Sequence, residues 1–385
     1  MQLTLNRSIK VVVYKLALMV LALLSVQLTY LNYSENVFIL YNSLIFIVGI
    51  HTCFTYQYQV KLWEGGEVNI NSILKGWAIS IPICLVSISL LELQVAVAVG
   101  FFMYLPFKYL ERLLYNYFIS NGSVDRAYAI SILSISVEVI IFSLLVQRVN
   151  EVYARFILPS TILLAIFLLI TVLVGIGKKK DKESKLNAFG FVSHSLFLVL
   201  VIMSDRYIIS FLEFDNKVSI KDYLLMFGYA SAVYTLVCSI LEVKRAQLFI
   251  KAKEEPSVIS YLIDNNFLGY FSIATLTFFM AFVVGVFINE QLYTIIVSQS
   301  ANEVWFQILV FFYLYAMVSF VHIYYLSNRL FLTLFISWLC ALAIKMAPLM
   351  LELDSVSAYL IWCSASAVVC ISLSVFFGKI NAISR

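Results

Sequence analysis

The stretch that decides the fold is FILPSTILLAIFLLITVLVGI, residues 156–176, followed at once by GKKKDKESK, residues 177–185. The first segment contains no charged side chain. A helix of about 20 apolar residues crosses the hydrocarbon core of a bilayer, which is roughly 30 Å thick. The second segment contains five lysines and marks the point where the chain leaves the lipid. Together they predict a membrane-spanning helix that ends in a charged loop.

Comparable apolar runs follow one another along the whole chain. Hydrophobic residues make up 62% of the 385 residues and charged residues only 12%, whereas a soluble domain is about half apolar and a quarter charged. Barrel strands would be short and alternating, so unbroken runs indicate helices. We therefore predict an all-α polytopic membrane protein with about twelve transmembrane helices. The runs lie at 11–31, 36–56, 73–92, 94–110, 128–146, 156–176, 186–212, 223–241, 267–287, 304–326, 331–351 and 358–377.

The placement of lysine and arginine predicts the topology. With the N-terminus in the cytoplasm, 19 of the 26 lie on the cytoplasmic side. The opposite side holds Arg148, Arg155, Lys217 and Lys221, and the spans hold Lys15, Arg206 and Lys345. Cytoplasmic loops are enriched in such residues, so both termini are expected in the cytoplasm. Two basic stretches, 108–127 and 242–261, are expected to lie as amphipathic segments along the headgroup layer.

The N-terminal run and the lysine-rich segment predict the domain organisation. Residues 1–31 are interpreted as a spanning helix rather than a signal peptide, because Lys15 interrupts the run and no small-x-small cleavage site follows it. The lysine-rich segment divides the chain into a six-helix lobe at 1–177, a basic linker at 178–186 and a second six-helix lobe at 187–385. Many transporters pair two such halves around a central path. The alternative is that this segment is one charged loop among others.

Ionisable side chains within spans cost several kcal/mol and usually face a cavity or a partner. His194 precedes Asp205 by eleven residues, or three helical turns, so the two are expected on one face, with Arg206 beside them. The predicted substrate-binding residues are Lys15, His194, Asp205 and Arg206. The alternatives are an ion pair between Asp205 and another helix, with Arg206 reaching outward, and a Lys15 that reaches the headgroups.

Glu138 is the second intramembrane carboxylate. It follows Ser131 and Ser134 at helical spacing, which predicts a polar stripe. A carboxylate in a low dielectric binds a proton or a cation more readily than in water, so Glu138 and Asp205 are the candidates for ion coupling. The alternative for Glu138 is an interhelical hydrogen bond or ion pair. Lys345 is expected to reach the membrane surface or to pair with Glu352, and His51 and His322 are interpreted as ordinary packed or interfacial residues.

No catalytic constellation is visible in the sequence. The six cysteines lie in apolar runs without a CxxC pair, and there is no P-loop, HExxH or GxSxG motif. The net charge is +4, and the basic residues form no stripe with interleaved aromatic residues. These absences disfavour an enzyme, and we predict no catalytic residues, metal site, cofactor or nucleic-acid partner.

Two segments resemble a known family. The run SDRYIISFLEFDNKVSIKDYLLMFGYASAVYTLV, residues 204–237, resembles the seventh and eighth helices of the Wzx-type polysaccharide flippases. These belong to the multidrug/oligosaccharidyl-lipid/polysaccharide exporter superfamily. The pair Asp205-Arg206 and Tyr223 fit the family pattern, while Asp222 stands where glycine is usual. The opening RSIKVVVYKLALMVLALLSVQLTYLNYSENVFILYNSLIF, residues 7–46, resembles the first helix pair of the family.

The resemblance implies a two-lobed bundle in the bacterial inner membrane. It would move undecaprenyl-diphosphate-linked oligosaccharides to the outer leaflet by alternating access, for O-antigen or capsule synthesis. Lys15 and Arg206 would contact the diphosphate. The implied partners are the lipid-linked oligosaccharide, membrane lipids and a polysaccharide polymerase. Two alternatives stay open: an O-antigen-type polymerase, which usually carries a larger external loop than is visible here, and a small-molecule exporter of the same superfamily.

Overall fold

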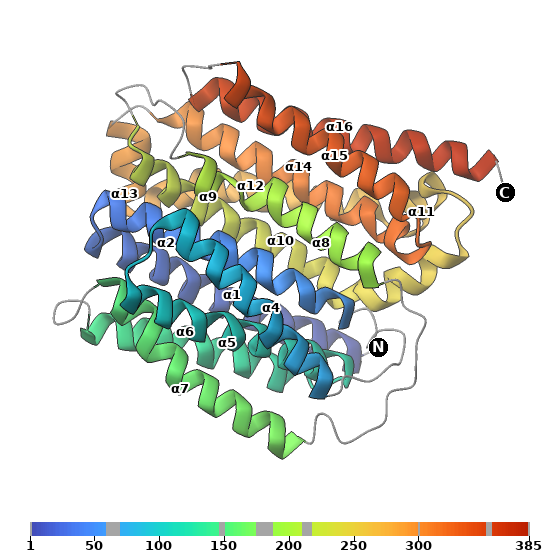
Figure 1. The fold of residues 1–385 in the computed structure, drawn as a ribbon. Helices are drawn as coiled ribbons and strands as arrows, with labels where there is room; N and C mark the ends of the chain where they lie inside the picture. The colour runs from blue at the N-terminus through green and yellow to red at the C-terminus, as the bar shows by residue number, and fades with distance from the viewer. Residues whose placement is uncertain are drawn as a thin grey trace. The chain divides into compact units, whose positions relative to one another are not determined.

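The computed structural model describes residues 2–58, 70–145, 151–174, 188–209, 218–298, 301–351 and 356–383 (Figure 1). Within these ranges the protein is helical and has no strand. The long helices are α1 (Gln2–Asn32), α2 (Glu35–Thr52), α4 (Ile70–Leu91), α5 (Val95–Ser120), α6 (Val124–Leu145), α7 (Glu151–Val174), α8 (Ala188–Met203), α10 (Ile220–Glu254), α12 (Phe267–Ile288), α14 (Asn302–Ser327), α15 (Phe331–Met350) and α16 (Val356–Ile383). Short elements join them: η1 (Cys53–Thr55), α9 (Asp205–Ile208), α11 (Val258–Asp264), α13 (Glu290–Tyr293) and η3 (Thr294–Ser298).

Each predicted apolar run overlaps one of these long helices, so the prediction of an all-α fold is confirmed. Among the described residues, six helices are by themselves long and apolar enough to cross a membrane. The pair α11 and α12, bent by 70° at its break, would make a seventh, and shorter apolar helices accompany them. Pro82, Pro106 and Pro348 lie inside α4, α5 and α15, as is tolerated within spanning helices.

The expectation that residues 108–127 form a separate amphipathic surface segment is wrong. The chain there is the second half of α5, a turn, and the start of α6. Leu110, Leu113 and Leu114 on this half of α5 are fully buried. Helix α5 ends in a left-handed glycine, Gly122 at φ +75°. The amides of Gly122 and of the next residue donate to carbonyls of the last turn, as in a Schellman motif. A continuous helix thus places Lys108, which is half-buried, beside Glu138 of α6.

Most of the second expected surface segment, 242–261, is an extension of the long helix α10. Helix α10 continues to Glu254 without a break, and α11 follows after a short turn. The segment is two-faced as predicted: Leu248 and Phe249 are buried, whereas Lys251 and Lys253 are exposed. The amphipathic pattern was therefore real, but it marks the end of a 35-residue helix rather than a separate element.

The chain folds into two compact units. We call Leu16–Val199 the N-terminal unit, and Met1–Lys15 together with Leu200–Arg385 the C-terminal unit. In the N-terminal unit α5 packs against α2, α4, α6 and α7, and α5 to α7 lie side by side in Figure 1. Helix α5 is the core of this unit, because most of its side chains between Phe101 and Phe118 are buried.

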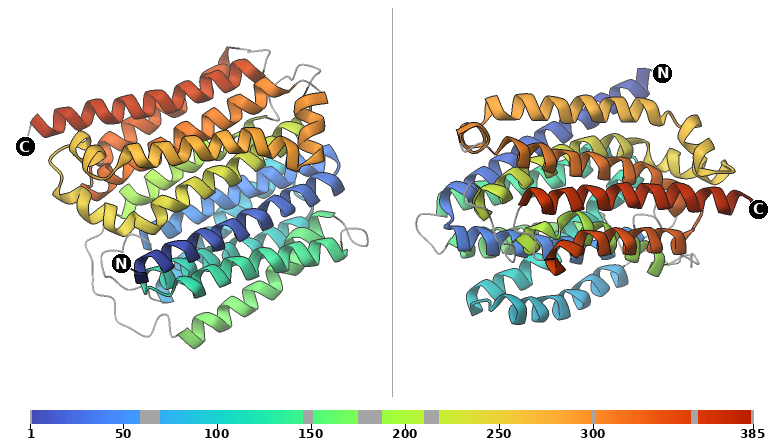
Figure 2. Two further views of the ribbon diagram at one scale, coloured as in Figure 1. Left: turned by 180° about the vertical axis from the view of Figure 1, so that it is seen from behind. Right: turned by 90° about the horizontal axis from the view of Figure 1, so that it is seen from above.

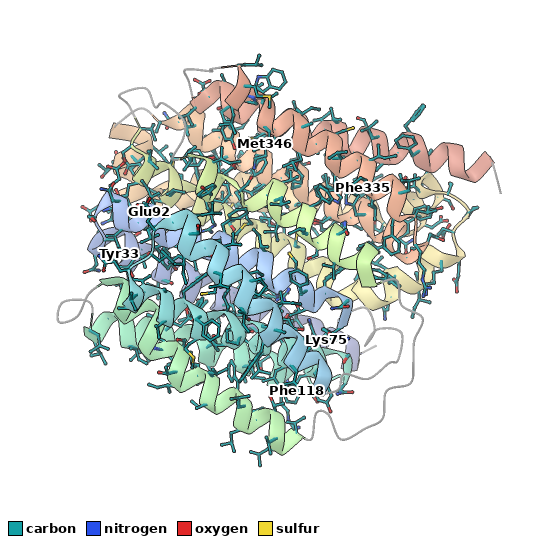
Figure 3. All side chains as sticks on the ribbon, viewed as in Figure 1. Tyr33, Lys75, Glu92, Phe118, Phe335 and Met346 are labelled. Carbon is teal, nitrogen blue, oxygen red and sulfur yellow. The ribbon has the colours of Figure 1, made fainter. Side chains whose placement is uncertain are left out.

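The C-terminal unit is built around α14. This helix packs against α10, α12 and α16, and α15 runs beside α16, as both views of Figure 2 show. Tyr315 and Trp338, from α14 and α15, are fully buried and stack with their ring centroids 6.0 Å apart. By contrast, outer helices expose large apolar side chains such as Phe335, labelled in Figure 3. Such a surface suits a lipid environment.

Candidate functional site

The first candidate site lies in the C-terminal unit, where the helix is interrupted between α8 and α9. Helix α8 ends at Met203, and the single turn of α9 begins at Asp205. The carboxylate of Asp205 is 0% exposed, and its Oδ1 lies 2.7 Å from Nζ of Lys345 on α15, which is also 0% exposed. The hydroxyl of Tyr359 on α16 donates a hydrogen bond to the same Oδ1. The ring of Tyr223, on α10, is fully buried with its hydroxyl beside this carboxylate.

The expectation that Lys345 reaches the membrane surface or pairs with Glu352 is wrong. Its ammonium is held inside by Asp205, by the carbonyl oxygen of Val201, and by the ring of Phe311 at 5.0 Å. Val201 belongs to the last turn of α8, where carbonyl groups lack intrahelical donors. The ammonium of Lys345 thus donates to a carbonyl oxygen at the end of α8 and pairs with the carboxylate of Asp205. These two interactions make the burial of its charge tolerable. Glu352 lies outside the described residues.

The second candidate site lies in the N-terminal unit, around Glu138 on α6. Oε1 of Glu138 lies 2.5 Å from Nζ of Lys108 on α5, and Glu111, one helical turn further along α5, lies 2.9 Å from the same nitrogen. Ser134 donates to Glu111 Oε2 at 2.9 Å and lies 3.4 Å from Glu138 Oε1. The hydroxyl of Tyr104 donates to Glu138 Oε2 at 3.3 Å. We call these five residues the Lys108 cluster.

The sequence predicted only part of the Lys108 cluster. Ser134 and Glu138 interact one turn apart, as the polar stripe on α6 predicted. Lys108 and Glu111 were missed because they were assigned to a surface segment. A usable signal was present: Tyr104, Lys108 and Glu111 follow each other at spacings of four and three, which places them on one face of a helix.

The remaining predicted residues are buried but belong to different surroundings. His194 lies in the N-terminal unit with its ring centroid 6.1 Å from that of Tyr56. Arg206 lies in the C-terminal unit, 8% exposed, with its guanidinium 5.6 Å from the centroid of Phe227. Lys15 on α1 is 9% exposed. Because α8 ends between His194 and Asp205, the unbroken helical face expected for this pair is interrupted at Ser204. The functional roles of these residues stay predictions.

The two other histidines are packed residues, the first of the two alternatives given for them. His51 is fully buried with Nε2 2.9 Å from Ser80 Oγ, and His322 lies with Nε2 3.2 Å from Ser374 Oγ. Among the described residues, no three His, Cys, Asp or Glu side chains gather in a way that would bind a metal ion. The two candidate sites offer a fully buried ion pair at Asp205 and Lys345 and a half-buried one around Lys108, each with hydroxyl donors.

Comparison with known proteins gives a match by fold. No protein-family model and no curated protein matches the sequence. An outward-facing multidrug resistance MATE family transporter of the MOP superfamily is similar with a TM-score of 0.60 and 10% identity, over 97% of this chain and 96% of that chain. The eukaryotic MATE transporter AtDTX14 is similar with a TM-score of 0.56 and 11% identity, over 99% and 98% of the two chains.

A third solved structure, a MOP superfamily transporter from Pyrococcus furiosus described by the reverse polarity of its binding pocket, has a TM-score of 0.52 and 11% identity, over 96% of each chain. The likeness in all three extends over nearly the whole length of both chains. This protein therefore has the two-lobed, all-helical fold of the MATE transporters of the MOP superfamily.

Proposed function

We propose that the protein is a transporter that moves an undecaprenyl-diphosphate-linked oligosaccharide across the bacterial inner membrane by alternating access. The observation that carries the proposal is the MOP transporter fold over 97% of the chain. It is supported by the resemblance of residues 204–237 to the Wzx-type flippases, which centres on Asp205-Arg206. The oligosaccharide would serve surface polysaccharide synthesis, with a polysaccharide polymerase and membrane lipids as further partners.

The physical demand on such a transporter is to pass a diphosphate through a medium of low dielectric constant. Cationic groups inside the protein lower that barrier, because Coulomb interactions are much stronger there than in water. Lys15 and Arg206 are buried cations that suit this role. The ion-pair partner of Asp205 is Lys345, so Arg206 is not the counter-ion of its neighbour. Arg206 would grip the diphosphate through its planar fork, and Lys15 would attract it as a point charge.

A small-molecule exporter is the second candidate, because one similar solved structure is a multidrug resistance transporter. The fold favours either transporter over a polymerase. The decisive experiment places the purified protein in liposomes with undecaprenyl diphosphate that carries a labelled oligosaccharide. We expect protein-dependent transfer of the label between leaflets and no export of cationic dyes. Dye export without lipid transfer would reject the flippase in favour of the exporter.

A gene-deletion experiment separates the flippase from the polymerase. Deletion of a flippase gene should leave unflipped lipid-linked repeat units on the cytoplasmic side. Single repeat units that reach the outside but stay unpolymerised would instead identify a polymerase and reject the proposal.

A further inference from the structure

The interruption between α8 and α9 has no cause in its own stretch of sequence. The apolar run 186–212 predicted one spanning helix, yet α8 ends at Met203 and α9 begins at Asp205. Breaks in long helices usually lie at proline, at glycine and serine pairs, or where a side chain or water enters the backbone ladder. Residues 200–209, LVIMSDRYII, contain no proline or glycine and a single serine. The backbone of Ser204 itself stays in the right-handed helical region, at φ −62° and ψ −21°.

The two polar side chains at the break do not cause it either. Serine and aspartate can end a helix by bonding to nearby backbone groups. Within the part of the chain that the structure describes, however, the hydroxyl of Ser204 makes no hydrogen bond. The carboxylate of Asp205 is held by Nζ of Lys345 at 2.7 Å and by the hydroxyl of Tyr359, which both come from other helices. The cause must therefore come from outside the segment.

The ammonium of Lys345 enters the backbone ladder at this point. In a regular helix the carbonyl oxygen of Val201 accepts a hydrogen bond from the amide four residues on, that of Asp205. Here the ammonium of Lys345 donates to this carbonyl oxygen, and the described residues include no backbone bond from Asp205 to Val201. The helix then restarts, because the amide of Tyr207 donates at 2.9 Å to the carbonyl of Ser204, only three residues back.

We propose that Lys345 makes the break between α8 and α9, and that it is thereby a positioning residue for Arg206. The ammonium takes the Val201 carbonyl from the Asp205 amide, and it holds the adjoining carboxylate in the same place. Arg206 follows at once on the single turn of α9, with its guanidinium 5.6 Å from the ring centroid of Phe227.

The direction of the Arg206 side chain depends on this break. Successive residues of a continuous helix are turned by about 100° about its axis, so closing the ladder would fix Arg206 at a different angle. The role of Arg206 rests on the proposed function. The break itself does not depend on what the protein transports.

Two variants that differ only at position 345 test the cause of the break. Asp205→Asn keeps the lysine, whereas Asp205→Asn with Lys345→Met removes the lysine and leaves no unpaired charge of this pair. We expect cryo-electron microscopy to show the break in the first variant. The second should have a continuous helix from Ala188 to Ile208, with the amide of residue 205 bonded to the carbonyl of Val201. A break that persists in the second variant, or that closes in the first, overturns the proposal.

A measurement on the natural protein does not depend on the folding of these variants. Solid-state NMR in liposomes can measure distances from 13C in valine carbonyls to 15N in lysine side chains. A carbonyl carbon lies about 4 Å from the nitrogen that donates to its oxygen. We expect this separation between Val201 and Nζ of Lys345, with loss of the signal in Val201→Ile, which removes the label. The absence of such a signal from the natural protein overturns the proposal.

A double-mutant cycle of lipid transfer in liposomes tests the positioning of Arg206. The variant Asp205→Asn with Lys345→Met and the variant Arg206→Lys should each lower transfer roughly tenfold. Their combination should lower it little further, because both disturb the same guanidinium. Losses that multiply to roughly a hundredfold would show independent roles and overturn the positioning of Arg206.

Lys251→Met, at an exposed position on α10, is the control for the loss of a lysine and should transfer lipid normally. A merely structural role of Lys345 would lower transfer independently of the residue at position 206. If the natural protein transfers no lipid while the break follows Lys345 as expected, the proposed function is lost and the cause of the break stands.

Discussion

Nζ of Lys345 lies 2.7 Å from Oδ1 of Asp205, and neither side chain is exposed. The two residues come from the chain segment after α8 and from α15, and the hydroxyl of Tyr359 completes the arrangement from α16. An ion pair without solvent stabilises only while both charges are present, since each has lost its hydration. The pair thus ties three parts of the C-terminal unit together and makes each charge dependent on the other.

The first prediction concerns this dependence. Lys345→Met leaves the carboxylate of Asp205 buried without a cation, so we expect a loss of about 3 to 5 kcal/mol in stability. The double variant Lys345→Met with Asp205→Asn removes both charges and should recover much of that loss. Thermal unfolding of the detergent-solubilised protein measures both variants. If Lys345→Met alone is as stable as the natural protein, the ion pair contributes nothing to stability.

The second prediction separates a phosphate clamp from a point charge at Arg206. Arg206→Lys keeps the positive charge but loses the planar fork that binds a phosphate in bidentate fashion. We expect lipid transfer in liposomes to fall by roughly tenfold, which corresponds to the loss of about 1.4 kcal/mol. Lys251→Arg, at an exposed position on α10, is the matched control and should transfer lipid normally. Equal activity of Arg206→Lys and the natural protein would argue against the clamp.

The third prediction concerns Asp205 in transport. Asp205→Asn keeps the shape of the side chain and removes the charge that holds Lys345. We expect the protein to insert into the membrane but to support less surface polysaccharide, because an unpaired lysine is left at the end of α8. Membrane protein levels and surface polysaccharide should be measured in the same cells. Natural polysaccharide levels with natural protein levels would limit Asp205 to a structural role.

The fourth prediction concerns topology. The lysine-rich segment and both termini should face the cytoplasm, because lysine and arginine lie mainly on that side. The placement of Lys108 inside α5 removes one residue from the cytoplasmic side but leaves the asymmetry intact. At Lys182 and at Arg385, a fused reporter that is active only in the cytoplasm should give a signal, and one that is active only in the periplasm should give none. Periplasmic activity at either position would contradict the orientation.

The fifth prediction tests the turn that ends α5. Gly122 has φ +75°, a conformation that costs residues with a Cβ roughly 1 to 2 kcal/mol, although nothing lies within 4 Å of the position that a Cβ would take. Gly122→Val should therefore lower stability by about that amount through backbone strain alone. Gly122→Asn, which tolerates this conformation better, should lose less. Thermal unfolding compares the two, and equal losses would indicate a cause other than backbone strain.

The sequence by itself determined that the chain is all-helical and roughly where its long helices lie, because each helix depends on a local property. A run of about 20 apolar residues has one stable form in lipid, whatever it packs against. The same reasoning identified Asp205 and Glu138 as residues that need a partner. It failed at 108–127, because a basic stretch with a helical period looks the same whether its charges meet water, headgroups or a carboxylate on another helix.

Only the tertiary structure decided those partners. Lys345 and Asp205 are far apart in the sequence, and Lys108 meets Glu138 only because α5 packs against α6. The length of a lysine side chain allows it to reach a membrane surface or a buried carboxylate, so its position in the sequence does not choose between them. The choice follows from which charge lies within a few ångströms in a low dielectric, and this distance is set by helix packing rather than by the local order of residues.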